Sequence, residues 1–218
     1  MASPTGIVDL RSDTVSTPTP EMRRAMADAE VGDDGYGEDP TVNRLQDLAA
    51  ERLGKEAGLY VPSGTMANQL ALRALARPGT EVLCAEGAHV YRYEGAAAAH
   101  NAGVQLRVVS TAGGVFGAVA IDAAAEATAH HFPPLAAVVV ENTYMPASGR
   151  PWTAAEVGAA ATAARARGLA VHCDGARIWN ASVALGVPAS ELVAATDTVM
   201  FCVSKGLGAP VGSVLCST

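Results

Sequence analysis

Several side chains capable of acid, base or nucleophilic chemistry stand directly after apolar runs in this sequence of 218 residues. Lys205 follows "TVMFCVS" and is the only charged residue from Thr198 to the last position. Asp174 and Arg177 follow "LAVHC", within "DGAR". Because a lysine is rarely buried unless it is paired or functional, Lys205 is predicted to serve a reaction. Burial among apolar and glycine residues would lower the pKa of its amine and favour the neutral form that attacks an aldehyde.

Two further groups follow other apolar runs. The turn "SGT" (Ser63, Gly64 and Thr65) leads from "AGLYVP" into a helical pattern, and the free N–H groups of a helix start can bind a phosphate. His89, in "HVYRYE", follows "EVLCAEGA". Each signal also has a plainer interpretation, since the turn could be a simple helix cap, the histidine a structural hydrogen-bonding group, and the Asp174 and Arg177 side chains a surface ion pair.

The apolar runs that precede these residues are predicted to be strands of one sheet. Strands are expected over 57–61, 81–85, 104–110, 135–142, 169–174 and 198–204, and helices over 20–29, 41–53, 65–76, 93–103, 122–129 and 153–168. Continuous apolar strands that alternate with helices indicate an α/β fold with a parallel sheet covered on both faces. Ligands of such sheets bind beyond the carboxyl ends of the strands, where these side chains would meet.

An anion-binding turn, a histidine, an acid, an arginine and a lysine at one sheet edge form the set that pyridoxal phosphate (PLP) requires. Its phosphate favours a helix start, its aldehyde combines with a lysine amine, and its ring nitrogen needs an acid that keeps it protonated. The sequence therefore predicts a PLP site.

At these residues the chain resembles the L-threonine aldolases, in the β-eliminating lyase group of fold-type I PLP enzymes. The shared motifs extend over nearly the whole chain: "DLRSDTVSTPTPEM", "VGDDGYGEDPTVNRLQDLAAERLGKE", "PSGTMAN", "AHVYRYE", "VENTYMPASGRPW", "HCDGARIWNA" and "SKGLGAPVGS". The resemblance implies the large domain of that fold, with a mostly parallel seven-stranded sheet between helices. It implies an N-terminal arm over 1–20 and a PLP-binding domain over 21–218, with the family's small C-terminal domain absent from this chain.

The resemblance also implies the residues that hold the cofactor. Lys205 would bind the aldehyde covalently, Asp174 would pair with the pyridine nitrogen, and Arg177 would reach the phenolic oxygen. His89 would stack on the ring. The phosphate would lie at the turn formed by Ser63, Gly64 and Thr65.

Substrate contacts are implied for residues in other motifs. Ser12 would contact the substrate carboxylate, and Tyr36 would reach the active site of a neighbouring subunit. Glu94 and Tyr144 are further candidates for substrate binding, although Tyr144 stands where the family commonly has a histidine. The general base is left open between His89 and His131, because an imidazole titrates near the operating pH.

The implied reaction is reversible aldol cleavage of L-threonine, L-allo-threonine and other β-hydroxy-α-amino acids to glycine and an aldehyde. One alternative is another fold-type I PLP lyase that performs β-elimination on an amino acid. A second is a truncated, non-catalytic cofactor-binding domain, because family members continue well beyond the lysine and this chain ends at Thr218.

Composition argues against several other classes of function. The net charge of −7 and the scattered basic residues disfavour nucleic-acid binding. No apolar stretch approaches the roughly 20 residues that span a bilayer, so no membrane partner is expected. The four cysteines form no C-x-x-C pair or metal-ligand spacing, so no bound metal is expected, and a reducing cytoplasmic location fits them. The partners expected are amino acid and aldehyde substrates and further copies of the chain, as a dimer or a dimer of dimers (a homotetramer).

Overall fold

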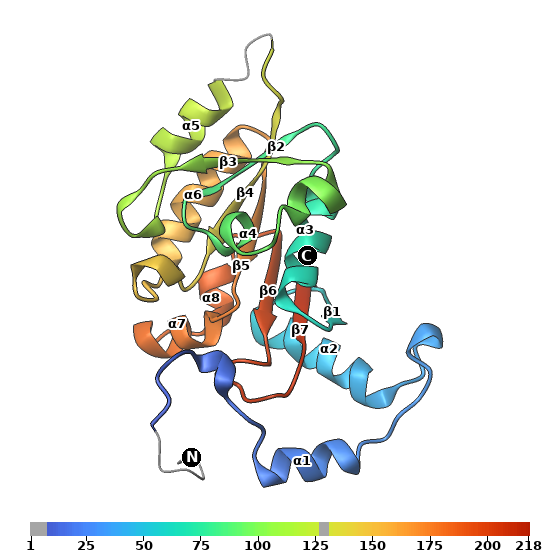
Figure 1. Ribbon diagram of the computed structural model, residues 1–218. Helices are drawn as coiled ribbons and strands as arrows, with labels where there is room; N and C mark the ends of the chain where they lie inside the picture. Colours follow the sequence, from blue (N-terminus) through green and yellow to red (C-terminus); the bar gives the residue numbers. More distant parts are fainter. Residues whose placement is uncertain (1–7, 127–130) are drawn as a thin grey trace.

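The computed structural model describes residues 8–126 and 131–218. Its centre is a seven-stranded sheet in the order β1-β7-β6-β5-β4-β2-β3 (Figure 1). The strands are β1 (Ala57–Val61), β2 (Glu81–Ala85), β3 (Gln105–Val109), β4 (Leu135–Glu141), β5 (Ala170–Asp174), β6 (Thr198–Cys202) and β7 (Ser213–Ser217). Only β7 runs antiparallel to its neighbours in these pairings, which confirms the predicted mostly parallel, seven-stranded sheet.

Helices cover both faces of this sheet. They are α1 (Pro20–Ala27), α2 (Pro40–Leu53), α3 (Gly64–Leu75), α4 (His89–Arg92), α5 (Ala118–Glu126), α6 (Ala154–Ala166), α7 (Ile178–Leu185) and α8 (Ala189–Val193). Helix α3 packs across the central strands on one face, while α2, α8, α6 and α5 contact one another in turn on the other (Figure 1). The buried apolar strands between these layers form the core.

Local sequence explains where the main helices begin and end. The side chains of Thr19, Asp39, Ser63 and Thr153 each accept a hydrogen bond from a backbone N–H of the first turn. Proline stands in the first turn of α1 and α2, where the missing N–H costs no hydrogen bond. Gly54 ends α2 in a left-handed conformation that glycine adopts without strain.

The structure differs from the predicted elements in five of its elements. The helix predicted over 93–103 does not form as one unit, because Gly95 and Ala96 both have positive φ between α4 and a short π-helical turn at Ala98–Ala102. Helix α5 begins at Ala118 rather than residue 122. Helices α7 and α8 were not predicted, and neither was the position of β7, whose run "SVLCS" has a serine at each end.

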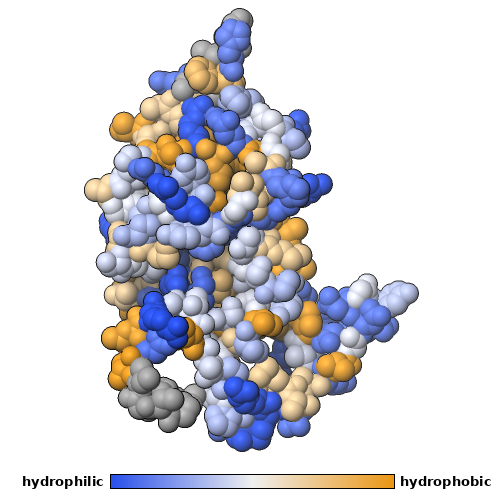
Figure 2. Space-filling model, in the orientation of Figure 1, coloured by the Kyte–Doolittle hydropathy of each residue, from blue (hydrophilic) through white to orange (hydrophobic). Residues whose placement is uncertain are grey.

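An extended N-terminal segment lies outside these layers. Helix α1 has no buried residue, and α1 together with the connection to α2 projects from the body of the molecule (Figure 1). The segment comprises the residues before α1, α1 itself and the connection that leads to α2 at Pro40. Hydrophobic and hydrophilic atoms are interspersed over it (Figure 2), and Val31 and Tyr36 are 78% and 84% exposed.

Candidate functional site

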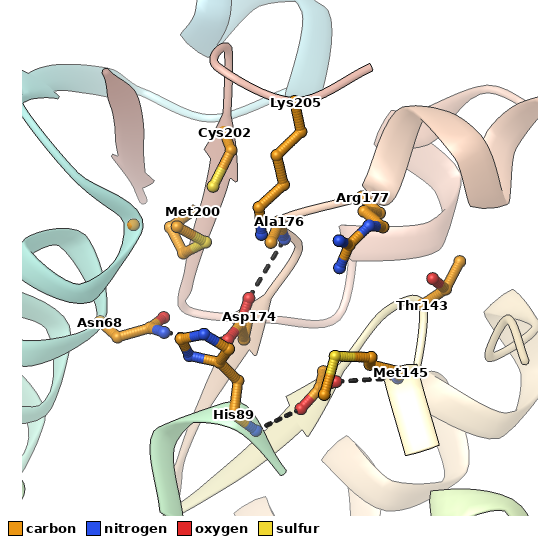
Figure 3. Close-up of a pocket in the computed structure, with 12 residues that line it drawn as sticks. Asn68, His89, Thr143, Met145, Asp174, Ala176, Arg177, Met200, Cys202 and Lys205 are labelled. Carbon is orange, nitrogen blue, oxygen red and sulfur yellow. Dashed lines mark hydrogen bonds between the residues drawn. The ribbon is translucent and has the colours of Figure 1, made fainter. Parts of the chain in front are cut away.

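Lys205, His89, Asp174 and Arg177, which were predicted from the sequence, lie together at the carboxyl edge of the sheet with Glu141, which was not. Glu141 ends β4 and Asp174 ends β5, and the two are directly paired in the strand register. Lys205 follows β6, and Arg177 follows β5 by one turn. All four line one pocket together with His89. Figure 3 shows Lys205 extending toward Ala176 and Asp174.

Lys205 is partly exposed rather than buried. The expectation of a buried lysine is wrong because the Gly-rich loop after β6 turns back on itself and leaves the side chain open to the pocket. In that loop, the Gly208 N–H donates to the Lys205 carbonyl at 2.9 Å, and Val203 N–H donates to the Gly212 carbonyl. The hydroxyl of Ser16 also donates to the Lys205 carbonyl, at 2.5 Å.

Asp174 is 2% exposed, and both of its oxygens accept hydrogen bonds. Oδ1 accepts from the Ala176 N–H at 3.1 Å, and Oδ2 accepts from the Asn68 amide at 2.9 Å. Hydrogen bonds to a carboxylate stabilise its charged form, which is the form that pairs with a cation. Asn68 was not predicted from the sequence, although it lies four residues after Gly64 and hence on the same face of α3.

Glu94 stands behind His89 rather than in the open pocket. Its carboxylate accepts from the amides of Asn68 and Gln69 and pairs with His89 Nδ1 at 2.9 Å. The hydrogen bond to Glu94 raises the pKa of His89, against the opposing effect of burial. Glu94 therefore orients and polarises the imidazole.

Glu94 also belongs to the one cluster in the described residues whose atoms could geometrically converge on a metal, with His89 and Asp174. The amide nitrogen of Asn68 lies between the two carboxylates and donates to both, at 2.8 and 2.9 Å. This amide donor therefore already bridges the two carboxylates of the cluster.

Arg177 makes a bidentate ion pair with Asp13, a residue that the sequence analysis did not select. The Arg177 Nε and Nη2 atoms donate to the two Asp13 oxygens at 2.8 and 2.6 Å. The pair is about three-quarters buried, and Arg177 lowers the pKa of Asp13. Together with the Ser16 contact, it fastens the N-terminal segment to the two loops that carry Arg177 and Lys205.

Substitution of Asp13 by alanine is expected to release this segment. Limited proteolysis should cleave the chain before α2 several-fold faster in Asp13→Ala than in the wild type, because a partly buried bidentate pair is lost. Asp9→Ala is the matched control, since Asp9 pairs with Arg11 in the same exposed stretch and, among residues 8–126 and 131–218, with no residue of another element. Equal cleavage rates for the two variants would contradict the proposed fastening.

A second cavity adjoins the first at the start of α3. Ser63, Gly64 and Thr65 line it from one side, and Ser204 and Lys205 from the other. The Ser63 hydroxyl accepts from the Met66 N–H, so the helix-cap interpretation holds for this side chain. The N–H groups of Gly64 and Thr65, the first two residues of α3, have no partner within the helix and can serve an anion.

Gly64 is required for the position of this turn. A Cβ atom at residue 64 would lie 2.9 Å from Cys202 Sγ and 3.0 Å from Met200 Cε. The absence of a side chain therefore lets the start of α3 approach β6, which brings this turn next to Lys205.

Glu141 is a pocket residue that the sequence analysis did not select. It is 7% exposed and accepts from the backbone N–H groups of His89, at 2.6 Å, and Met145, at 2.9 Å. Burial, with a smaller effect from the charge of Asp174, raises the pKa of Glu141 to about 7. Its signal in the sequence was the acid at the end of the apolar run "LAAVVVE".

The raised pKa of Glu141 predicts a pH-dependent stability. The unfolded chain binds this proton only below about pH 4.3, so the stabilisation by the protonated form is full below that value. It is lost as the pH rises through the folded pKa near 7. Urea unfolding of the wild type should show a decreasing free energy of unfolding from pH 5 to 8, and Glu141→Gln should flatten it. If Glu141→Gln kept the full wild-type slope, Glu141 would not be the source of this pH dependence. A smaller slope of the same sign should remain in the variant, because the pKa of His89 is also raised.

Besides Glu94 and Tyr144, which lie behind and beside the pocket, three predicted site residues lie away from it. His131 precedes β4 and thus lies at the opposite edge of the sheet from Glu141. Tyr36 lies in the projecting connection before α2. Ser12 is exposed and caps the short helix that contains Asp13, so it lies one residue away from the partner of Arg177.

Tyr144 is buried beside the pocket and has a structural contact. Its hydroxyl accepts from the Gly87 N–H at 3.0 Å, and its ring packs so closely on Gly114 that a Cβ there would lie 2.2 Å from Tyr144 Cγ. It holds the loop after β2 against the loop after β4. The neighbouring residue Met145 lines the pocket instead.

The fold and the site define an α/β protein with a lysine-containing pocket at the carboxyl edge of a mostly parallel sheet. Residues 9–218 match the beta-eliminating lyase family, and the chain belongs to that family. In the described part of the chain, no helix has the length and apolar composition to cross a bilayer.

Comparison with individual proteins agrees with this assignment. The chain is 44% identical to a probable low-specificity L-threonine aldolase 2 of Arabidopsis thaliana, over 99% of this chain and 62% of that protein. It is 42% identical to the low specificity L-threonine aldolase of Escherichia coli K12, over 96% of this chain and 62% of that protein. The fold is similar to that of Leishmania major threonine aldolase, with a TM-score of 0.82 and 20% identity over 94% of this chain and 61% of the other. The chain thus spans less than two thirds of the length of these relatives.

Proposed function

We propose that the chain binds PLP in this pocket and belongs to an enzyme that cleaves L-threonine and related β-hydroxy-α-amino acids to glycine and an aldehyde. The observation that carries the proposal is the convergence of Lys205, Asp174 and the start of α3 on adjoining cavities. The names of the 42–44% identical relatives support the choice of substrate.

The donor set fits PLP at each of its polar groups. Lys205 offers the amine for the aldehyde, Asp174 an anionic acceptor for the ring nitrogen, and the turn formed by Ser63, Gly64 and Thr65 the N–H groups for the phosphate. When bound, PLP supplies an electrophilic aldehyde and a ring that accepts electrons. Arg177 would contact the phenolic oxygen, for which it must share its guanidinium with Asp13.

His89 is the better supported of the two candidate bases. Its Nδ1 is hydrogen-bonded to the Glu94 carboxylate, so the neutral ring carries its proton on Nδ1 and its lone pair on Nε2. Nε2 can then accept a proton from the substrate hydroxyl, and the raised pKa of His89 favours that transfer. His131 lies at the other sheet edge in this chain.

The proposal includes assembly into a homo-oligomer, a dimer or a homotetramer, with active sites shared between subunits. The exposed Tyr36 and Val31 on the projecting segment support such contacts, and Tyr36 would then reach a neighbouring pocket. The cytoplasm is proposed as the compartment because all four cysteines are free and buried.

Incubation of the PLP-loaded protein with L-threonine, and in parallel with L-allo-threonine, tests the function. Glycine and acetaldehyde in equal amounts are expected. Ammonia and a keto acid would instead identify a β-eliminating enzyme. Bound PLP without either set of products would identify this chain as a cofactor-binding domain that is not catalytic by itself.

A further inference from the structure

Asn68 is the centre of a buried hydrogen-bond network that joins Asp174 to the two histidines behind and beside it. The Asn68 side chain extends from α3 toward Asp174 and the His89 ring (Figure 3), and the residue is 1% exposed. Its amide nitrogen donates to Asp174 Oδ2 at 2.9 Å and to Glu94 Oε1 at 2.8 Å. Its amide oxygen faces His172 Nε2 at 3.0 Å.

The direction of every hydrogen bond in this network follows from the two carboxylates. Carboxylate oxygens accept only, so the NH2 group of Asn68 must face Asp174 and Glu94, and the amide oxygen must face His172. His172 Nε2 therefore carries a proton and donates it to Asn68. His172 Nδ1 then accepts from the Thr198 hydroxyl at 2.8 Å.

Burial keeps His172 neutral, as this arrangement requires. The residue is 0% exposed, and burial lowers its pKa to about 4, although the nearby charge of Asp174 acts in the opposite direction. His172 and Asp174 are two residues apart on β5 and so project from the same face of the sheet toward α3. The network thus runs in one direction, from Thr198 through His172 and Asn68 to the two carboxylates.

Asp174 is surrounded by titratable and charged groups from every neighbouring element. These are His89 of α4 and Glu94 after it, Glu141 of β4, His172 of β5, and Arg177 and Lys205 in the loops after β5 and β6. The neutral amide of Asn68 lies between two of these acids and donates to both Asp174 and Glu94. It separates two like charges that would otherwise repel each other at the closed side of the pocket.

We propose that Asn68 is a positioning residue that holds Asp174 as an oriented anion and, through Glu94, couples it to the orientation of the His89 ring. The inference rests on the proposed function, because it concerns the acid that would pair with the ring nitrogen of PLP. Without Asn68, Asp174 loses the donor to Oδ2 and faces Glu94 directly, so it holds a protonated ring nitrogen less well.

Gln69 provides a matched control on the same helix. It is the next residue and is also buried, and its amide donates to Glu94 Oε2 at 2.7 Å; in the described part of the chain it does not hydrogen-bond to Asp174. Gln69→Met therefore removes a buried amide and a Glu94 contact while leaving the Asp174 contact in place. Asn68→Leu removes the hydrogen bonds of Asn68 to Asp174, Glu94 and His172 with little change in volume.

The test measures cofactor binding and the pH dependence of the visible absorbance of the Lys205-bound cofactor, in the PLP-loaded protein. For Asn68→Leu, the Kd for PLP is expected to rise by about tenfold or more, because this factor corresponds to the free energy of one charge-assisted hydrogen bond. The pH midpoint of the absorbance change should move upward, because a less positive ring withdraws fewer electrons from the nitrogen bound to it. Gln69→Met should leave both quantities within about twofold and a few tenths of a pH unit of the wild type.

A second variant keeps the test decisive if Asn68→Leu does not fold. Thr198→Val removes the donor to His172 with almost no change in shape, far from the pocket opening, and should move the pH midpoint in the same direction by a smaller amount. Thr196→Val, which removes a buried hydroxyl that donates to the Val193 carbonyl outside this network, is its control. A wild-type protein without a Lys205-dependent colour would defeat the proposed function. If the wild type is coloured and Asn68→Leu leaves the Kd and the pH midpoint unchanged, this inference alone is overturned. If Asn68→Leu does not fold, an unchanged pH midpoint in Thr198→Val overturns it instead.

Discussion

Lys205→Ala is expected to abolish covalent attachment of PLP completely. Wild-type protein incubated with PLP and then borohydride should gain the mass of one reduced cofactor on the peptide that contains Lys205, and Lys205→Ala should gain none there. The reason is chemical, since an alanine has no amine and no other lysine lines the pocket. Visible colour and any aldol cleavage should disappear with the attachment.

The sequence contains one other lysine, which makes a sharp control. Lys55 is 8% exposed and its Nζ donates to the carbonyls of Val193, at 3.1 Å, and Thr196, at 2.5 Å. Lys55→Met should leave the labelling of Lys205 intact while lowering the free energy of unfolding, because two buried carbonyls lose their donor. If Lys205→Ala retained the label on the pocket peptides, the assignment of Lys205 as the attachment site would be wrong.

Asp174→Asn is expected to give the second large effect. A neutral amide cannot balance a protonated ring nitrogen. In either orientation of the new side chain, its NH2 group would also face a donor, the Asn68 amide in one orientation and the Ala176 N–H in the other. Loss of such a preorganised electrostatic contact typically lowers the rate by about 100- to 1,000-fold. The kcat/KM for L-threonine cleavage should fall by that factor, and the Kd for PLP should rise.

The fold of Asp174→Asn should be retained, because the change removes a charge that faces Glu141 and Glu94. Thermal unfolding measured beside activity would show this. Asp197→Asn is a suitable control. Like Asp174, Asp197 accepts a hydrogen bond from a backbone N–H, that of Val171 at 2.6 Å, but it lies outside the pocket. A loss of less than about tenfold in Asp174→Asn would argue against a role of Asp174 at the ring nitrogen.

Most of the architecture was predictable from local pattern. Apolar runs of five to seven residues became strands at nearly the predicted positions, because each is long enough to cross the core and too apolar for a surface. Errors arose where the pattern carries no local signal. The alanine-rich stretch after Glu94 favours a helix by propensity, yet Gly95 and Ala96 adopt positive φ there because the chain must turn toward β3.

The sequence by itself determined that Lys205, Asp174, Arg177, His89 and the turn 63–65 follow strands or begin a helix at one edge, because parallel strands end on the same side of a sheet. Only the tertiary structure decided which side chains touch. Asn68 reaches Asp174 across 106 positions of chain, and Asp13 reaches Arg177 across 164. It also excluded His131 from this chain's pocket, left Lys205 partly exposed and added Glu141. These outcomes depend on strand register and on how closely α3 packs against β6, which local sequence does not encode.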